Sequence, residues 1–439
     1  MAKFIITGGQ PLYGSVRLGG AKNASFKLML ASLLMQSESR LLNFSRISEV
    51  NLVAQAISAL GGTITRRGER TLFINPQTLK TFSLPQKFGA ASRSAPMFLP
   101  VLLHRFGRAE VPLPGGDQLG QRSIAWHLEA LAQMGAHISQ SGTTLKAVTA
   151  GLHGTTYRFP KNSHTGTETV IMAAVLAHGQ TLIQNAAQEP EVDDLINFLN
   201  HAGARIRRLV SRQIAIEGVA RLAGTIHQIM PDRNEAVSYA CAALITRGDI
   251  IVENAQSQHL EAFLAKLNDI GAGFELGSFG IRFYYHQPLQ ACTVVTAPHP
   301  GFMTDWQPLW AVLATQLQGT SVIHETVHVD RFQYLDHLIK MGAKVKPFSP
   351  KIAQPEKFYN FVYTQAGKHN PAARIYGPTR LKAGKFTCRD LRHGATLVLA
   401  ALAARGTSIL SQVDQIDRGY EEFDQRLGSL GANIQRQAT

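Results

Sequence analysis

A pattern of hydrophobic and polar positions recurs six times along the chain. In each copy a helix-like segment ends in Gly followed by Gly or Ala, and a strand-like alternation of polar and apolar residues comes next. The six glycines are Gly61, Gly135, Gly203, Gly271, Gly342 and Gly431. They lie roughly seventy residues apart, with a longer last interval. Because glycine at a helix end favours the left-handed conformation, each is expected to stop a helix before a strand.

Each repeat also contains an apolar, alanine-rich segment that leads into a glycine, as at 170–179 and 397–406. Helices that are apolar on all sides are buried. Six copies in 439 residues indicate two globular domains of three units each. The predicted fold class is therefore α/β, with two inverted (inside-out) α/β barrels in which sheets surround buried helices.

The predicted division lies near Met230. The first barrel is expected to span 22–230 and to carry a mobile loop. The pattern of the strands within 1–21 does not show which half they join, and we expect them to dock on 231–439 to complete the second barrel. The longer last interval contains a segment rich in Pro and Lys, about 346–382, which is expected to be an exposed excursion.

Composition narrows the class of protein. The chain is 45% apolar and 17% charged, which is ordinary for a soluble globular protein. Its net charge of +14 is scattered rather than gathered in a stripe, which favours a small anionic ligand over nucleic acid. Without a membrane-spanning apolar run or a signal-peptide pattern, a cytoplasmic location and no membrane partner are expected. Cys241 lies in an apolar run and is expected to be a buried, inert thiol.

Two glycine-containing segments are candidates for ligand binding. A Gly pair precedes Lys22 and Asn23 where a strand pattern gives way to a helix, and helix N-termini favour anions. The alternative is a solvated lysine at a turn. The loop 114–122 contains three glycines and carries Asp117 and Arg122. Such a loop closes over a substrate in many enzymes, or it is simply a long hairpin turn.

Charged residues recur beside the repeat landmarks. Asp305 precedes an apolar helix and is either a catalytic carboxylate or a plain helix cap. Arg93, Arg331, Arg392 and Arg418 lie close to the repeat landmarks. Clustered arginines suit the bidentate capture of carboxylate and phosphate, although each alone is typical of a surface.

Together these segments resemble the UDP-N-acetylglucosamine 1-carboxyvinyltransferase family. The resemblance covers essentially the whole chain and keeps the order and spacing of the motifs. The matching stretches are Gly20–Ala24, Arg105–Gly107, Leu113–Gly116, Asn185–Ala187, Glu189–Glu191, Pro231–Arg233, Thr296–Pro300, Thr304–Asp305, Glu325–Val327, Arg331–Phe332, Asp390–Arg392 and Ile416–Tyr420. That family has two inverted α/β barrels with the active site between them, in accord with the repeat count.

The resemblance implies roles for individual residues. Those implied to bind phosphoenolpyruvate are Lys22, Arg122 and Arg418. Those implied to contact the sugar nucleotide are Lys22, Asn23, Arg93, Asp305 and Val327. Those implied to line the same cleft are Arg331, Asp390 and Arg392. Asp305 is implied to take the proton of the attacking 3-hydroxyl, and Asp117 to protonate phosphoenolpyruvate.

Two departures from the family pattern bear on these roles. The common loop cysteine, which fosfomycin alkylates, is replaced by Asp117, as in some members of the family. A carboxylic acid can also deliver the proton, so the chemistry is expected to survive together with resistance to the drug. The residues that usually wrap the uracil are replaced by 123–126. Trp126 either stacks on a base or belongs to the core, and we slightly favour the core.

The implied activity is transfer of the enolpyruvyl group of phosphoenolpyruvate to the 3-hydroxyl of UDP-N-acetylglucosamine, without metal or cofactor, as the first committed step of peptidoglycan precursor synthesis. One alternative is an enolpyruvyl transferase for another acceptor such as shikimate 3-phosphate, although the Gly-Ser-Lys-Ser and Gly-Asn-Ala-Gly-Thr motifs of that enzyme are missing. Another is a non-catalytic paralogue that binds nucleotide or RNA, against which Lys22, Asp305 and Arg418 argue. The sequence leaves the oligomeric state open.

Overall fold

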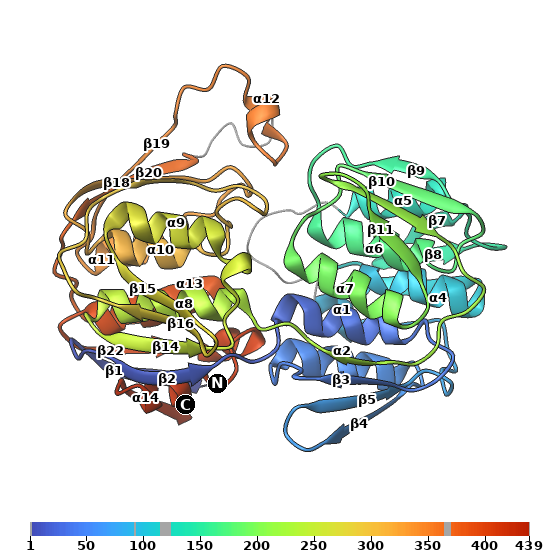
Figure 1. Cartoon of the computed structure of the whole chain (residues 1–439), viewed down its shortest axis with the longest axis horizontal. Coiled ribbons are helices and arrows are strands. Elements are labelled where there is room, and N and C mark those ends of the chain that lie inside the picture. Colours follow the sequence, from blue (N-terminus) through green and yellow to red (C-terminus); the bar gives the residue numbers. More distant parts are fainter. Residues whose placement is uncertain (1, 92–93, 115–123, 364–369, 439) are drawn as a thin grey trace. The chain divides into compact units, whose positions relative to one another are not determined.

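The computed structural model describes residues 2–91, 94–114, 124–363 and 370–438 (Figure 1). Contacts divide the described chain into two compact units. We call the described residues within 19–230 the N-terminal unit, and the described residues within 1–18 and 231–439 the C-terminal unit. Each unit has a hydrophobic core of its own.

The N-terminal unit consists of three sheets around helices. Its helices are α1 (Lys22–Ser32), α2 (Ser48–Ala59), α3 (Lys87–Ala91), α4 (Phe98–Phe106), α5 (Ala125–Gln133), α6 (His164–Ala174) and α7 (Pro190–His201), with a 3-10 turn at Ala95–Met97. Its strands are β3 (Ser39–Leu42), β4 (Thr63–Arg67), β5 (Thr71–Asn75), β6 (Arg108–Pro112), β7 (His137–Ser141), β8 (Thr144–Val148), β9 (Thr156–Arg158), β10 (Gln180–Gln184), β11 (Arg205–Arg208), β12 (Gln213–Glu217) and β13 (Ile226–Gln228). The sheet orders are β13-β3-β5-β4, β6-β8-β7 and β11-β12-β10-β9.

The C-terminal unit repeats this plan. Its helices are α8 (Arg233–Ile245), α9 (Glu261–Ile270), α10 (Gln307–Ala314), α11 (Leu335–Lys340), α12 (Pro355–Phe358), α13 (Leu391–Ala403) and α14 (Phe423–Ser429), with 3-10 turns η2 (Ser257–His259) and η4 (Val413–Arg418). Its strands are β1 (Ala2–Gly8), β2 (Tyr13–Arg17), β14 (Asp249–Glu253), β15 (Gly273–Gly277), β16 (Gly280–Tyr284), β17 (Thr293–Val295), β18 (Gly319–His324), β19 (Lys344–Phe348), β20 (Ala372–Gly377), β21 (Lys385–Thr387), β22 (Gly406–Ser411) and β23 (Asn433–Ala438). The sheet orders are β15-β16-β14-β2, β17-β18-β20-β19 and β21-β22-β1-β23.

The same unit of structure occurs six times. A buried helix leads into a strand, an amphipathic helix follows, and an antiparallel pair of strands ends the repeat, as in α6, β10, α7 and the pair β11–β12. Every residue of α8 and of α10 is buried. Figure 1 shows helices enclosed by strands in each unit. The predicted inverted α/β fold with inner helices and outer sheets is therefore confirmed.

The six landmark glycines have the backbone conformation expected of them. Their φ angles lie between 73° and 102°, in the left-handed region. Each directly follows or closely follows the last residue of an amphipathic helix, so that the chain turns from helix to strand where a side chain would be strained. The local glycine pattern thus fixes the ends of six helices.

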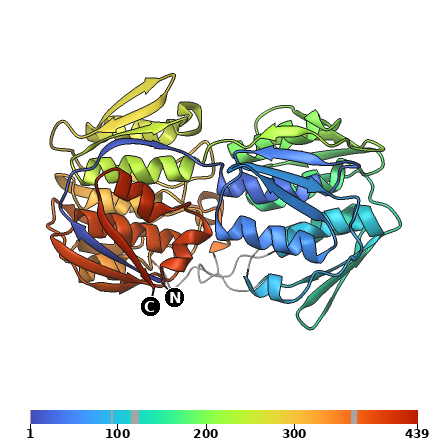
Figure 2. The ribbon, with the colours of Figure 1, turned by 90° about the horizontal axis from the view of Figure 1, so that it is seen from below.

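The N-terminal strands complete the C-terminal unit. β1 lies between β22 and β23 and pairs antiparallel with both, with Phe4 opposite Leu410 and Arg436. β2 runs parallel to β14 at the edge of another sheet. The chain ends accordingly lie close together (Figure 2). β1 therefore supplies the strand that the last repeat lacks.

The segment expected to be an exposed excursion, about 346–382, is shorter than predicted. Its ends are the strands β19 and β20, which pair with each other and belong to an ordinary sheet. The proline and lysine residues near its ends are not typical of strands. The two paired strands are also far apart in the sequence, so no local hairpin pattern indicates them. The excursion lies between them, within 349–371, and carries the short helix α12, where the side chains are mostly exposed.

Two smaller expectations concern burial. Cys241 is fully buried in α8, and desolvation raises the pKa of its thiol far above the ordinary value, so the thiol is inert as predicted. Within the described ranges, no helix is long and apolar enough to cross a membrane.

Candidate functional site

Asp305 lies at the centre of a charged cluster in the C-terminal unit. It precedes α10 by two residues. Its Oδ1 accepts a hydrogen bond from Nη2 of Arg331 at 2.7 Å, and its Oδ2 accepts one from Nη2 of Arg392 at 3.1 Å. The side chain of Asp305 is 23% exposed, whereas those of Arg331 and Arg392 are 2% and 6% exposed. A partly accessible carboxylate is thus held from behind by two buried cations.

A chain of hydrogen bonds fixes the guanidinium of Arg392. Its Nη1 donates to the hydroxyl of Tyr420 at 3.0 Å, and that hydroxyl lies 2.7 Å from Oγ of Ser238. Because Ser238 Oγ donates to the carbonyl of Asn234, Tyr420 is the donor to Ser238. The hydroxyls of Tyr420 and Ser238 each donate to a defined acceptor, so the position of Arg392 is linked to α8 through Tyr420.

The charge of Arg392 is secured by its neighbours. Burial disfavours the charged guanidinium, but the negative charge of Asp305, together with Asp232 and the hydrogen bond to Asp305, outweighs burial and raises the pKa of Arg392 above its usual value. Tyr420 also stays neutral, because burial raises the pKa of its hydroxyl, although Arg392 acts in the opposite direction. The cluster therefore keeps its cation at any ordinary pH.

A second buried carboxylate shapes the segment next to Asp305. Glu325 follows β18 and accepts hydrogen bonds from Oγ1 of Thr304 at 2.9 Å and from the backbone N–H groups of Val327 and His328 at 2.7 and 3.0 Å. Desolvation raises the pKa of Glu325, and these hydrogen bonds oppose the rise. Glu325 thereby ties the Val327 backbone to the residue preceding Asp305. Glu325 lies in a stretch that matches the family pattern, but that pattern alone does not indicate this role.

Asp390 and Arg418 have different local settings. Asp390 caps α13: its Oδ1 accepts from the backbone N–H groups of Arg392 and His393 at 2.9 and 3.0 Å. It therefore holds the helix turn that carries Arg392, and its predicted place in the cleft stays a prediction. Arg418 ends η4, where its Nη1 lies 3.5 Å from Oε1 of Gln415. The structure thus brings Asp305, Arg331 and Arg392 into contact, with Asp390 behind them.

In the N-terminal unit, Lys22 and Asn23 open the buried helix α1, as expected from the Gly pair before them. Both are partly buried, and the residue that caps α1 is Ala21, whose side chain offers no hydrogen bond. The first backbone N–H groups of a helix without such a cap can bind an anion. The ammonium of Lys22 lies 5.7 Å from the ring centre of Phe26. This arrangement suits a small anion.

The same unit contains a buried ionic cluster that sequence reasoning missed. Nζ of Lys27 in α1 lies 2.5 Å from Oε2 of Glu168 in α6, and both side chains are almost completely buried. Nε2 of His164 lies 3.1 Å from Lys27 and 3.2 Å from Glu168. The local sequence pattern does not predict this cluster. Lys27 lies in a largely apolar helix, and its partners are far away in the sequence. The cluster joins two inner helices by charge.

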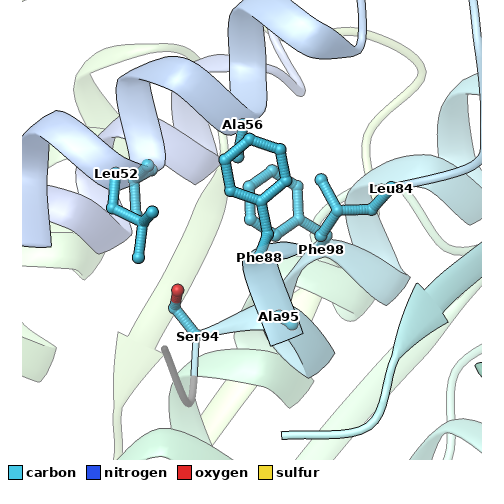
Figure 3. A pocket seen from close by; sticks show the side chains of 8 residues that line it. Leu52, Ala56, Leu84, Phe88, Ser94, Ala95 and Phe98 are labelled. Carbon is cyan, nitrogen blue, oxygen red and sulfur yellow. The ribbon is translucent and has the colours of Figure 1, made fainter. Parts of the chain in front are cut away.

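A small apolar pocket also lies in the N-terminal unit (Figure 3). Its lining residues are Leu52, Val53, Ala56, Leu84, Phe88, Ser94, Ala95 and Phe98. In Figure 3 the aromatic rings of Phe88 and Phe98 stand beside Leu84, and the hydroxyl of Ser94 is the one polar group drawn. An apolar lining does not suit a phosphate or carboxylate. We therefore take the charged clusters, rather than this pocket, as the candidate site.

Three predicted site residues, Arg93, Asp117 and Arg122, lie outside the described residues. Trp126, which follows the loop 114–122, lies in α5. Its side chain is partly buried and packs against the core of the N-terminal unit. This packing agrees with the interpretation of Trp126 as a core residue.

Comparisons with known proteins show the family to which this chain belongs. The family model described as EPSP synthase (3-phosphoshikimate 1-carboxyvinyltransferase) matches residues 6–427. Two curated relatives named UDP-N-acetylglucosamine 1-carboxyvinyltransferase are similar over almost the full chain. The protein from Idiomarina loihiensis is 38% identical over 99% of both chains, and that from Protochlamydia amoebophila is 40% identical over 98% of this chain and 93% of its own.

Solved structures with the same fold are more distant in sequence. The enolpyruvyl transferase NikO from Streptomyces tendae superposes with a TM-score of 0.85 at 20% identity, covering 100% of this chain and 99% of its own. EPSP synthase from Acinetobacter baumannii gives a TM-score of 0.74 at 17% identity, with 100% of both chains covered. Because both its fold and its full-length sequence similarity agree, the chain belongs to the UDP-N-acetylglucosamine 1-carboxyvinyltransferases, within the wider EPSP synthase family of enolpyruvyl transferases.

Proposed function

We propose that this protein transfers the enolpyruvyl group of phosphoenolpyruvate to the 3-hydroxyl of UDP-N-acetylglucosamine and releases phosphate. The observation that carries the proposal is Asp305, a partly exposed carboxylate between the buried guanidiniums of Arg331 and Arg392. A carboxylate in reach of solvent can accept a proton from a bound hydroxyl. The relatives that share the full chain carry the name of this activity.

The proposed reaction is an addition followed by an elimination. Asp117 gives its proton to the methylene carbon of phosphoenolpyruvate while the 3-hydroxyl oxygen forms a bond to C2. Asp305 accepts the hydroxyl proton. The tetrahedral intermediate then loses phosphate from C2 and a proton from the new methyl group, and the carbon–carbon double bond is restored.

Cationic side chains neutralise the anions in this scheme. Lys22, Arg122 and Arg418 bind phosphoenolpyruvate, and positive groups fixed in advance stabilise charge without having to reorganise during the reaction. Asn23, Arg93 and Val327 contact the sugar nucleotide. We propose that the chain needs no metal or cofactor for this reaction, that it acts in the cytoplasm, and that its product feeds peptidoglycan synthesis and thereby cell shape and division.

The proposed domains are residues 22–230, and residues 1–21 together with 231–439. These limits are supported by the contact units, which separate within a few residues of the same positions.

The decisive experiment measures phosphate release from phosphoenolpyruvate by the purified chain. Rapid release with UDP-N-acetylglucosamine, and none with shikimate 3-phosphate, is the expected result. Release with shikimate 3-phosphate would identify the other acceptor class. If phosphate is released with neither, while the chain binds nucleotide or RNA, it is a non-catalytic paralogue and the proposal is wrong.

A further inference from the structure

Two buried histidines link α11, which begins four residues after Arg331, to α13, which carries Arg392. His337 lies in α11, and His393 lies in the first turn of α13. Nδ1 of His337 and Nε2 of His393 are 2.7 Å apart, and the two residues are 7% and 3% exposed. Neither residue has a part in the proposed reaction or in the sequence motifs above.

The hydrogen bond between these rings has a fixed direction. The backbone N–H of Arg389 donates to Nδ1 of His393 at 3.0 Å, so that nitrogen carries no proton. A neutral imidazole then has its proton on Nε2, which must donate to Nδ1 of His337. A proton added to either accepting nitrogen would face another donor. Both rings therefore have to be neutral, each in one tautomer, for the contact to exist.

The same two elements set the distance between the guanidiniums around Asp305. Arg331 lies four residues before α11 begins, and Arg392 is the neighbour of His393. Each guanidinium binds a different oxygen of the Asp305 carboxylate. A shift of α11 against α13 would therefore move one guanidinium relative to the other and turn the carboxylate.

We propose that the hydrogen bond from His393 to His337 positions Arg331 and Arg392 around Asp305. The two histidines are positioning residues for a group that accepts a proton, and do not touch the substrates. This inference rests on the proposed function, because it assigns their effect to the step in which Asp305 acts.

The test compares two substitutions at one position. His337→Phe keeps a ring but removes the acceptor, whereas His337→Asn can offer its amide oxygen close to the place of Nδ1. We expect His337→Phe to lower kcat by roughly ten- to a hundredfold, with KM for both substrates nearly unchanged, because a small misplacement of a reacting group costs rate rather than binding. We expect His337→Asn to recover most of kcat.

The matched control is His104→Phe. His104 is a partly buried histidine with a hydrogen bond of its own, its Nε2 lying 2.7 Å from the carbonyl of Ala173, but it lies in the N-terminal unit. Its loss should lower the melting temperature without a selective fall in kcat. If His337→Phe keeps the wild-type kcat, or if His337→Asn does no better than His337→Phe, the positioning role is wrong.

Nitrogen-15 NMR of the imidazoles in the wild-type chain tests the geometry without any activity measurement. Protonated Nε2 and unprotonated Nδ1 in His393 at neutral pH is the expected result, and the opposite tautomer would overturn the inference. An inactive wild-type chain would instead contradict the proposed function. A normal wild-type chain whose His337→Phe variant is equally active would contradict this inference alone.

Discussion

At the scale of single residues, the environment of Asp305 decides what its carboxylate can do. Both oxygens are engaged by buried guanidiniums, yet a quarter of the side chain is open to solvent. Breaking one partner of such a cluster leaves a buried cation without its counter-charge, which is costly. To test the chemical role of Asp305, the substitution should therefore preserve the shape of the side chain and one oxygen that can accept a hydrogen bond.

Asp305→Asn should leave substrate binding nearly intact and lower turnover by at least about a hundredfold, because an amide cannot take up the hydroxyl proton. Phosphate release at saturating substrates and equilibrium binding of UDP-N-acetylglucosamine provide the two measurements. Asp269→Asn, at an exposed ion pair with Lys266, is the control and should change neither. Near-normal turnover in Asp305→Asn would reduce Asp305 to a structural residue.

The residue at position 117 should determine the response to fosfomycin. A carboxylate is a poorer nucleophile than a thiolate toward an epoxide, so the wild-type chain should resist the drug, and Asp117→Cys should become sensitive. The alkaline limit of activity should also rise in Asp117→Cys, because a free thiol ionises near pH 8.5 and a free carboxylic acid near pH 4. Mass spectrometry of drug-treated protein and a pH–rate profile give both answers. Covalent modification of the wild-type loop would contradict the assignment.

At the scale of elements, the contact between α11 and α13 depends on protonation. Burial, followed by the repulsion that a protonated His393 would meet from a protonated His337 and from Arg389, lowers the pKa of His393 to about 3. Burial also lowers the pKa of His337, with Arg389 and Lys340 acting the same way and Asp336 opposing them. Asp390 accepts a hydrogen bond from the backbone of His393 at the same helix end. The folded chain thus holds neutral two rings that the unfolded chain would protonate below about pH 6.5.

The free energy of unfolding should therefore fall as the pH drops from about 6.5 toward 5. In this window His393 binds a proton in the unfolded state but not in the folded state. One such group changes the free energy of unfolding by up to about 1.4 kcal/mol per pH unit. Urea unfolding at several pH values measures it. His393→Asn should show a shallower slope than the wild type, whereas His286→Asn, at an exposed histidine, should not. Equal slopes in all three proteins would contradict the prediction.

Across the fold, the described residues form two hydrophobic cores, and the N-terminal strand β1 belongs to the core formed by residues that are distant from it in the sequence. Phe4 in β1 is fully buried in the core of the C-terminal unit. Its strand lies between two strands from the end of the chain. A destabilising substitution in β1 should therefore lower the stability of residues 231–439 rather than that of the N-terminal unit.

Phe4→Ala should destabilise the C-terminal unit by about 3–5 kcal/mol, the usual cost of emptying a buried aromatic site. Hydrogen exchange of the full-length chain should then be faster in β22 and β23 and unchanged in β3 and β5. Ile74→Ala, at a fully buried residue of β5 in the core of the N-terminal unit, should produce the reverse pattern. Equal loss of protection in both units after Phe4→Ala would show that the two cores do not act separately.

The repeat, the burial of the inner helices and the end of each amphipathic helix could all be predicted from the amino-acid sequence. These properties are local, because the periodicity of apolar residues and the conformational freedom of a glycine such as Gly61 act within a few residues. The same reasoning identified Asp305, Arg331 and Arg392 as candidates, with the help of a family resemblance, but it could not state which of them touch.

Those contacts join residues that are far apart in the sequence and form only when the chain folds. Asp305 is 26 residues from Arg331 and 87 from Arg392, and His337 is 56 from His393. Their meeting depends on how two separate repeats pack around one core, which no local pattern encodes. The position of β1 likewise depends on the tertiary structure. β1 pairs with the edges of β22 and β23, and these edges lie beside each other only once the rest of the sheet has formed.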